Sequence, residues 1–294
     1  MGDFMPCCSA IVRPLLLVVI LSGVCSPLSA GVVYVNSRVG SDAFDGRSEF
    51  PVNRRVGPVR TLQRAAACLC VGDSIVLAEN GVPYFGSLSL VNQRHSGVPT
   101  RPVEIIGNGA IISGARPIPR KAWTSEGLDL WRITPIRKRY VQLSRGNETL
   151  PSYDLPWSLS YLPNAPADHW YREGHSVVLK TEPGEHPALQ PLDLAREDVG
   201  LTLLGVEHVV IRDVTFRHFR LDGINLHDRC HNVVLDNVVC EGNGRAGVAV
   251  GGTSQVVIRN SLLADNRKYS LLITELGQAE VTDSEMMRRP AIVE

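Results

Sequence analysis

The sequence lacks an excess of charge of either sign, because 30 Lys and Arg residues balance 30 Asp and Glu residues among 294. This balance gives no indication of nucleic-acid binding, which usually requires a basic surface, so no nucleic-acid partner is expected. The chain also lacks cysteine pairs with metal-knuckle spacing: a single residue separates Cys68 from Cys70, and no second pair follows. A structural zinc site is therefore not predicted. Apolar residues make up 44% of the chain, which excludes a disordered protein.

The first thirty residues differ from the rest of the chain. Arg13 precedes the apolar run PLLLVVILSGVC, and the small residues Ser29 and Ala30 follow it. This pattern predicts a secretory signal peptide that is cleaved after Ala30. The apolar core is too short to predict a membrane span, so the expected location is secreted, periplasmic or in the cell envelope, with a retained anchor as the alternative. Cleavage leaves four cysteines whose pairing the spacing does not determine: Cys68, Cys70, Cys230 and Cys240.

An internal repeat occupies the C-terminal part. Three copies align without a gap from His208, Asn232 and Gln255, at steps of 24 and 23 residues, and a partial fourth copy begins at Ala279. Asn and Asp tolerate the left-handed conformation of a tight corner, and their stacked side chains can bond to one another. We therefore predict a structural role for the turn residue that recurs at one place in every copy: Asp213, Asn237, Asn260 and Asp283.

Apolar residues alternate with polar ones in three short runs per copy, as in strands with one buried face. Such a repeat buries its apolar face only when copies stack edge to edge. The pattern therefore predicts an all-β fold, a parallel β-helix with three strands per coil and coils of 23–24 residues. The expected inward columns are Val209/Val233/Val256, Ile211/Leu235/Ile258, Phe216/Cys240/Leu263/Met286, Ile224/Val248/Leu271 and Leu226/Val250/Ile273.

The N-terminal part has a different pattern. Leu62, Ala65, Ala66 and Leu69 share one helical face, as in a short helix that caps the end of a solenoid. The segments YVNSRVGSDAFDGRS, RTLQRAAACLCVGDSIVLAENGVPYFG and GVPTRPVEIIGNGAIISG resemble the opening of secreted right-handed parallel β-helix proteins of the pectate lyase-like superfamily. The resemblance covers roughly residues 31–116 and 201–294. It implies right-handed coils but no particular substrate, because these motifs cap and turn the chain.

Residues 117–200 show no 23-residue register, are rich in Pro and contain all four Trp residues. In proteins of the kind that this chain resembles, such insertions form a small β-subdomain packed on the solenoid. The expected organisation is a signal peptide (1–30), a cap with the first coils (31–116), an inserted β-subdomain (117–200) and regular coils (201–294), of which the last is incomplete. We expect the Trp side chains to be core residues rather than platforms for sugar rings: Trp123, Trp131, Trp157 and Trp170.

In enzymes of this superfamily the substrate lies along the outward face of the first strand and the long turn before it. Mapped onto this chain, the catalytic candidates are Arg220, Asp222, Arg245 and Lys268, and the substrate-binding candidates are His218, Asn225, Arg267 and Tyr269. Basic groups about 5 Å apart on successive coils suit an acidic polysaccharide. Uronate elimination needs a cation to neutralise the carboxylate, a base and an acid. The basic candidates would serve as neutraliser or base; the alternative is a solvated charged turn without a site.

No cofactor is predicted with a defined ligand set. Asp222 and Asp265 would supply oxygen ligands for Ca²⁺, although the sequence shows no acidic ladder like that of a pectate lyase calcium site. The Asp222-Gly223 pair resembles half of the polygalacturonase signature, but the remaining motifs are missing, so galacturonan hydrolysis is not expected. A further group has no stacked partner in the next coil and predicts no metal site: His227, Asp228, Cys230 and His231.

These patterns predict an exported protein that acts on or binds an extracellular polysaccharide, with uronate-lyase-like cleavage of an acidic polymer as the leading activity. The alternative is a non-catalytic surface or envelope solenoid that binds a glycan or a protein. No stable membrane span is expected after the signal peptide is removed. The last repeat ends at Glu294 without a polar cap, which suggests either self-association through the open coil or a shortened member of the superfamily.

Overall fold

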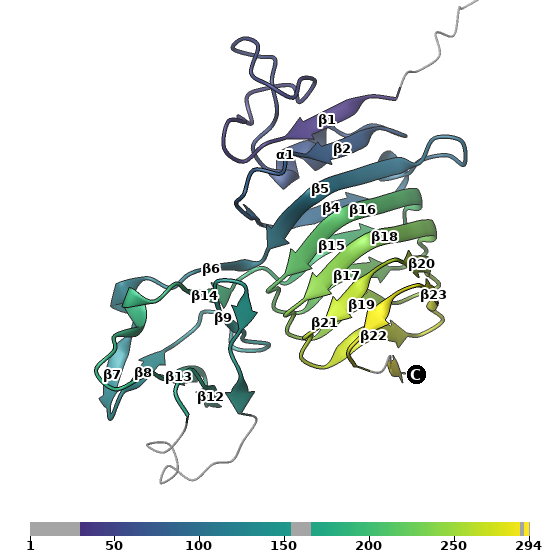
Figure 1. The fold of residues 1–294 in the computed structure, drawn as a ribbon. Helices are drawn as coiled ribbons and strands as arrows, with labels where there is room; N and C mark the ends of the chain where they lie inside the picture. Colours follow the sequence, from purple (N-terminus) through teal and green to yellow (C-terminus); the bar gives the residue numbers. More distant parts are fainter. Residues whose placement is uncertain (1–29, 154–165, 289–290, 294) are drawn as a thin grey trace, which may run out of the picture.

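A computed structural model describes residues 30–153, 166–288 and 291–293. Within these residues, parallel strands stack coil upon coil, and the expected all-β parallel β-helix is confirmed (Figure 1). The purple N-terminal strands lie at one end of the solenoid and the yellow C-terminal strands at the other, with the inserted segment to one side. No helix in the described part of the chain is long and apolar enough to cross a membrane.

Sheet A and sheet B form the walls of the solenoid. Sheet A contains β1 (Val32–Val35), β2 (Ser74–Leu77), β3 (Tyr84–Phe85), β5 (Val103–Ser113), β16 (Glu207–Arg217), β18 (His231–Glu241), β20 (Gln255–Arg259), β21 (Leu262–Ala264), β23 (Gln278–Thr282) and β24 (Glu285–Met286). Sheet B contains β4 (Leu88–Val91), β15 (Val199–Leu204), β17 (Asp222–His227), β19 (Ala246–Val250), β22 (Tyr269–Thr274) and β25 (Ala291–Val293).

The pairing register reproduces the repeat read from the sequence. Val209 pairs with Val233 and Val233 with Val256, so the coil step is 24 and then 23 residues. Phe216, Cys240 and Leu263 lie in one column and are fully buried. Stacking therefore buries a continuous apolar core, as expected for a repeat that cannot fold alone.

The recurring turn residues bend each coil. Asp213, Asn237, Asn260 and Asp283 all have φ between 46° and 57°, and Asn237 Nδ2 donates a hydrogen bond to Asp213 Oδ1 at 2.8 Å. This confirms their structural role. The strand β18 runs through its bend, whereas the next coil breaks there into β20 and β21, so the three strands per coil are separate only in part of the solenoid.

A second column of stacked amides, inside the solenoid, was not anticipated. Asn243 Nδ2 donates to Asn266 Oδ1 at 2.9 Å, and Asn266 Nδ2 donates to the Cys240 carbonyl at 2.9 Å. Both side chains are buried. They satisfy the backbone of the long turn that precedes each strand of sheet B, because Phe219 N–H also donates to Asn243 Oδ1 at 3.0 Å. Buried hydrogen bonds inside the solenoid thus stabilise the turns that carry the candidate residues.

The expected capping helix is confirmed as α1 (Leu62–Cys68), whose N-cap Thr61 accepts a hydrogen bond from Arg64 N–H. Leu62, Ala65 and Leu69 bury its apolar face against the first coils. Short 3₁₀ turns follow elsewhere in the chain: η1 (Gln93–His95), η2 (Arg120–Ala122) and η4 (Pro187–Leu189). The helix covers an end of the core that would otherwise face solvent.

The inserted segment forms two small sheets. One contains β6 (Ala115–Pro117), β9 (Leu143–Arg145), β10 (Glu148–Thr149) and β14 (Leu192–Ala195); the other contains β7 (Thr124–Gly127), β8 (Leu130–Ile133), β11 (Ser152–Tyr153), β12 (Trp170–Glu173) and β13 (Ser176–Lys180). Trp123 and Trp170 are buried in a separate apolar cluster, and Trp131 packs against it. The expected core role of these three is confirmed, while Trp157 lies outside the described residues.

Candidate functional site

The structure places three of the predicted catalytic residues in ion pairs within the protein. Arg220 forms a salt bridge with Asp198 and also donates to the Arg139 carbonyl of the insertion. Arg245 Nε donates to Asp222 Oδ1 at 2.8 Å, and its Nη2 bonds to the other oxygen of that carboxylate. These hydrogen bonds raise the pKa of the Arg245 guanidinium. The two arginines therefore form ion pairs within the protein and are not free to neutralise a substrate carboxylate.

Contacts with the insertion engage two further basic candidates. Arg267 lies over the Trp170 ring, with Cζ 5.7 Å from the ring centroid, and Lys268 Nζ lies 5.5 Å from the centroid of the Tyr140 ring. Both contacts are cation–π interactions between a coil and the insertion. Arg267 and Lys268, which suggested an open basic groove, thus contact the insertion.

Asn225 was expected to face outward into an open groove; it stands in the outward column with Ala249 and Leu272, but that column is covered. The Asn225 side chain is buried and its Nδ2 donates to Asp222 Oδ2 at 2.9 Å. Tyr269 is half-buried against an outward apolar cluster of sheet B that includes Ala249 and Leu272. The reason is that both faces of β17 are covered, as its burial pattern shows.

The proposed calcium ligands do not come together. Both oxygens of Asp222 already accept hydrogen bonds from Arg245, and one also accepts from Asn225. Asp265 is exposed and lines a cavity to which Asp222 does not belong. Among residues 30–153, 166–288 and 291–293, no three His, Cys, Asp or Glu side chains are grouped as a metal site requires. These two aspartates thus do not fit Ca²⁺.

A cavity of about 760 Å³ lies between the solenoid and the insertion. One wall is the turn that joins β9 and β10, with the residues that follow it; the other is formed by the ends of the coils. Its polar lining combines carboxylates, amides and basic groups: Gln142, Asn147, Glu148, Thr149, Ser152, His218, Glu241, Asp265, Arg267 and Arg288. We call it the interface pocket. Its volume lies within the range of ordinary small-molecule sites.

The solenoid wall of the pocket is built by one column of the coil. His218, Gly242 and Asp265 follow the equivalent strand ends in successive coils, and all three have positive φ, between 51° and 61°. Backbone conformation therefore does not by itself demand glycine at the middle position. A Cβ on Gly242 would lie 2.4 Å from Thr149 Oγ1 and 2.8 Å from His218 Cδ2. Because Gly242 has no side chain, the insertion can approach the solenoid there, and space for the pocket remains between His218 and Asp265.

Carboxylates enter the pocket from both walls. Glu241, at the end of β18, lies 3.8 Å from the Arg217 guanidinium, and burial lowers the pKa of Arg217 while Glu241 opposes that change. Asp265 is on the next coil, and Glu148 is on the facing β10. Both are exposed, and no ion pair or hydrogen bond of their carboxylates occurs within the described residues. The pocket thus offers acid and base groups on two sides.

The buried imidazole of His218 predicts an acid sensitivity of the fold. His218 is 2% exposed; burial, with a smaller effect from Arg217, lowers its pKa from 6.5 to about 4, and the Asn147 backbone opposes this shift only weakly. Between pH 6.5 and about 4 the unfolded chain takes up a proton at this residue and the folded chain does not. Stability should therefore fall as the pH falls through this window, by about 3 kcal/mol in total, since each pH unit changes the free energy of unfolding by about 1.4 kcal/mol.

Urea unfolding at several pH values measures this effect. The matched control is His218→Asn, because Asn readily adopts the positive φ of this position. The difference in stability between the two proteins should change between pH 6.5 and 4 and be constant above pH 7. Parallel pH profiles for the two proteins would contradict the assignment.

Sequence reasoning singled out His218 and Arg267 as binding candidates and mentioned Asp265 as a calcium ligand, and the structure brings these three together in the interface pocket. It missed Glu148, because the insertion has no repeat that would place it against the coils. It also missed Glu241, although Glu241 stands in the same column as Arg217. A signal was available there, since an Arg and a Glu on successive coils at one outward position indicate a charged pair at the rim of the solenoid.

A family model and one solved structure support the fold. The family model described as "Right handed beta helix region" matches residues 196–289, which supports the right-handed coil direction. A solved structure titled "Glycoside hydrolase" superposes with a TM-score of 0.62 at 12% sequence identity, over 84% of this chain and 68% of that chain. A second, titled "The complex structure of XylC with xylose", gives a TM-score of 0.48 at 10% identity, over 86% and 62% of the two chains. Comparison with curated proteins finds no match.

Proposed function

We propose that this protein is an exported, pectate lyase-like β-helix protein that binds a polysaccharide in the interface pocket and hydrolyses its glycosidic bonds. The observation that carries the proposal is that one cavity is lined by Glu241 and Asp265 on successive coils and by Glu148 on the facing wall. Most glycoside hydrolases use two carboxyl groups that flank the glycosidic bond. The likeness in fold to a protein titled as a glycoside hydrolase supports this activity.

In the proposed reaction, one carboxylic acid protonates the leaving glycosidic oxygen. A second carboxylate either activates a water molecule or attacks the anomeric carbon, and the added water is divided between the two product sugars. Glu241 and Asp265 stand on successive coils, whose backbones are about 5 Å apart, and are offset by one residue. They are the pair that we assign to this chemistry, while Asn147 and Gln142 supply amide groups that suit sugar hydroxyls.

A second candidate function follows from the basic residues in the same pocket. Arg267 and Arg288 line it together with the carboxylates, and a guanidinium is well suited to bind the carboxylate of a uronic acid. Eliminative cleavage of an acidic polysaccharide would then use an arginine as the neutralising group. In this second candidate, the lyase chemistry takes place in the interface pocket instead of on the outward face of β17.

A screen against neutral and uronic-acid polysaccharides, with and without a chelator, tests both candidates. Hydrolysis produces new reducing ends without ultraviolet absorbance, and elimination produces reducing ends together with an absorbing unsaturated product. We expect reducing ends alone. Binding without cleavage would favour the non-catalytic solenoid, and the absence of both binding and cleavage across the panel would overturn the carbohydrate proposal.

A further inference from the structure

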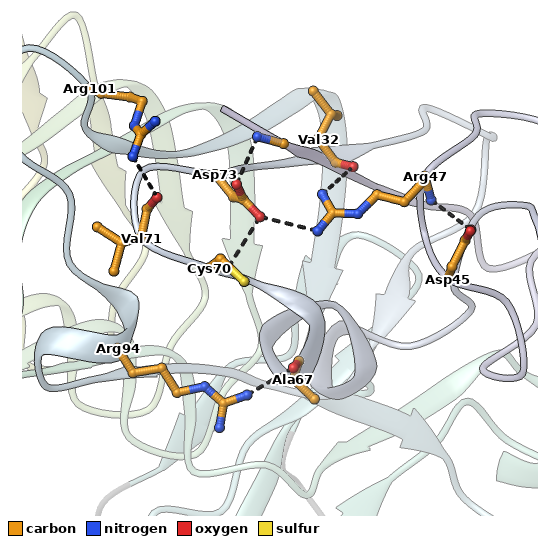
Figure 2. Close-up of polar contacts among 10 residues, drawn as sticks. Val32, Asp45, Arg47, Ala67, Cys70, Val71, Asp73, Arg94 and Arg101 are labelled. Carbon is orange, nitrogen blue, oxygen red and sulfur yellow. Dashed lines mark hydrogen bonds and ion pairs between the residues drawn. The ribbon is translucent and has the colours of Figure 1, made fainter. Parts of the chain in front are cut away.

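Asp73 is a buried carboxylate in the N-terminal cap that collects hydrogen bonds at the start of the fold. Its side chain is 7% exposed. Its Oδ2 accepts from Cys70 N–H at 3.2 Å and lies 3.4 Å from Arg47 Nη2 (Figure 2). Its Oδ1 accepts from Gly31 N–H at 2.7 Å. Figure 2 also shows Arg47 donating to the Val32 carbonyl, so this carboxylate connects the start of strand β1 to the turn before β2.

Gly31 lies close to the ends of the Arg47 and Asp73 side chains. A Cβ at this position would lie 2.3 Å from Arg47 Nη1 and 2.9 Å from Asp73 Oδ1. Its φ is not in the left-handed region; the contacts are all with the ends of the Arg47 and Asp73 side chains, so a larger residue would have to displace them. The preceding Ala30 is exposed. The Ala30–Gly31 peptide bond therefore lies at the point where the chain enters the packed structure.

The same bond is the expected cleavage point of the signal peptide. The amide nitrogen nearest to the buried carboxylate is thus the atom that processing would convert into an amino group. That nitrogen is 2.7 Å from Asp73 Oδ1, which is a suitable distance for an ammonium–carboxylate contact. A free α-amino group has an ordinary pKa of about 7.7–8.0, so it is charged at neutral pH and more so beside a carboxylate.

We propose that the bond between Ala30 and Gly31 is a processing site, and that the α-ammonium group released on Gly31 forms a salt bridge with Asp73 that locks the cap. A leader peptidase that accepts small residues before the cleaved bond would catalyse the reaction. Water would be the second reactant. The C–N bond breaks, the leader keeps the new Ala30 carboxylate, and the Gly31 nitrogen takes up protons to become an ammonium group. One neutral N–H donor is thereby replaced by a charged group with three donors, next to a carboxylate that is already buried.

The processed chain should be more stable than one with a single extra residue, because strand β1 begins beside the salt bridge and pairs with β2 through Val32 and Ser74. Charge-assisted hydrogen bonds are roughly twice as strong as neutral ones. The gain corresponds to an increase in Tm of about 2–4 °C for a chain of this size. The effect should depend on the carboxylate and disappear when it is replaced.

The first test expresses the full chain in a secreting bacterial host and measures the intact mass of the exported protein. We expect a mature chain that starts at Gly31; a different N-terminus, or an uncleaved chain, would overturn the proposal. The second test compares the Tm of chains that start at Gly31 and at Ala30, which differ by one alanine. The Gly31 form should melt about 2–4 °C higher.

The Asp73→Asn variant separates the salt bridge from a general effect of the extra residue. In this background the Gly31 and Ala30 forms should have the same Tm, because the charged partner of the ammonium group is gone. Equal Tm values of the two forms with Asp73 intact would overturn the salt bridge, as would a difference that persists in Asp73→Asn. None of these outcomes depends on the proposed sugar chemistry.

Discussion

We expect the Asp265→Asn protein to lose polysaccharide cleavage by about 10²- to 10⁴-fold, the range typical of a missing general acid or base. Asn has nearly the same size as Asp but cannot donate or accept the proton that the reaction transfers. The substitution should leave the fold unchanged, because Asp265 is exposed, and Asn adopts the positive φ of 51° without difficulty. The measurement is kcat/KM on the polysaccharide that the screen identifies.

Two companion variants make this result specific. Glu241→Gln should lower the rate by a similar factor, since it removes the second carboxylate of the assigned pair. Asp283→Asn is the matched control: it is another exposed aspartate with positive φ, at a coil bend away from the pocket, in a column that already contains Asn237 and Asn260. Its rate should be that of the unmodified protein. Unchanged cleavage in both Asp265→Asn and Glu241→Gln would remove the interface pocket as the active site.

The second large effect concerns stability: Arg245→Ala should lower the free energy of unfolding by about 3 kcal/mol, in the range for breaking a buried ion pair. Asp222 is 0% exposed, and Arg245 bonds to both of its oxygens. Removing the arginine leaves this buried carboxylate without its charged partner. Urea unfolding, followed by far-ultraviolet circular dichroism, gives the difference directly.

The structure offers controls within the same columns. Lys268 occupies the position of Arg245 in the next coil but is exposed, so Lys268→Ala should change stability by no more than about 0.5 kcal/mol. Ala246 occupies the position of Asp222 in the next coil, so alanine is compatible with that place. The double variant Asp222→Ala/Arg245→Ala should therefore lose less stability than Arg245→Ala alone. A stable but inactive Arg245→Ala protein would favour the outward face of β17 as the catalytic surface.

The solenoid was predictable from the sequence because its coils repeat the same local pattern. A column such as Phe216, Cys240 and Leu263 can be read directly once the step of 24 or 23 residues is known. The corner asparagines were predictable for a similar reason, since each one serves its own turn. The buried pair Asn243 and Asn266 also recurs at the 23-residue step, yet nothing in the sequence distinguishes an amide inside the turn from one on its surface.

The site was less predictable, because it depends on contacts between segments without a common register. Arg267 lies against Val141, 126 residues away, and over Trp170. The sequence shows that Arg220, Arg245 and Lys268 recur on one side of the coils, which suggested a basic groove. It does not show that these groups already have partners within the protein, which are Asp198, Asp222 and the ring of Tyr140.

The sequence by itself determined the coil, its period, its inward columns, its bends and its capping helix, since each of these follows from the local periodicity of side chains and from turn chemistry. Only the tertiary structure decided which charges are free. An ionic side chain has the same sequence signature whether it faces a ligand or a partner within the protein, and its role depends on what packs against it. Here residues of the insertion contact Arg220, Arg267 and Lys268, and the cavity lined by Glu148, Glu241 and Asp265 lies between the insertion and the coils.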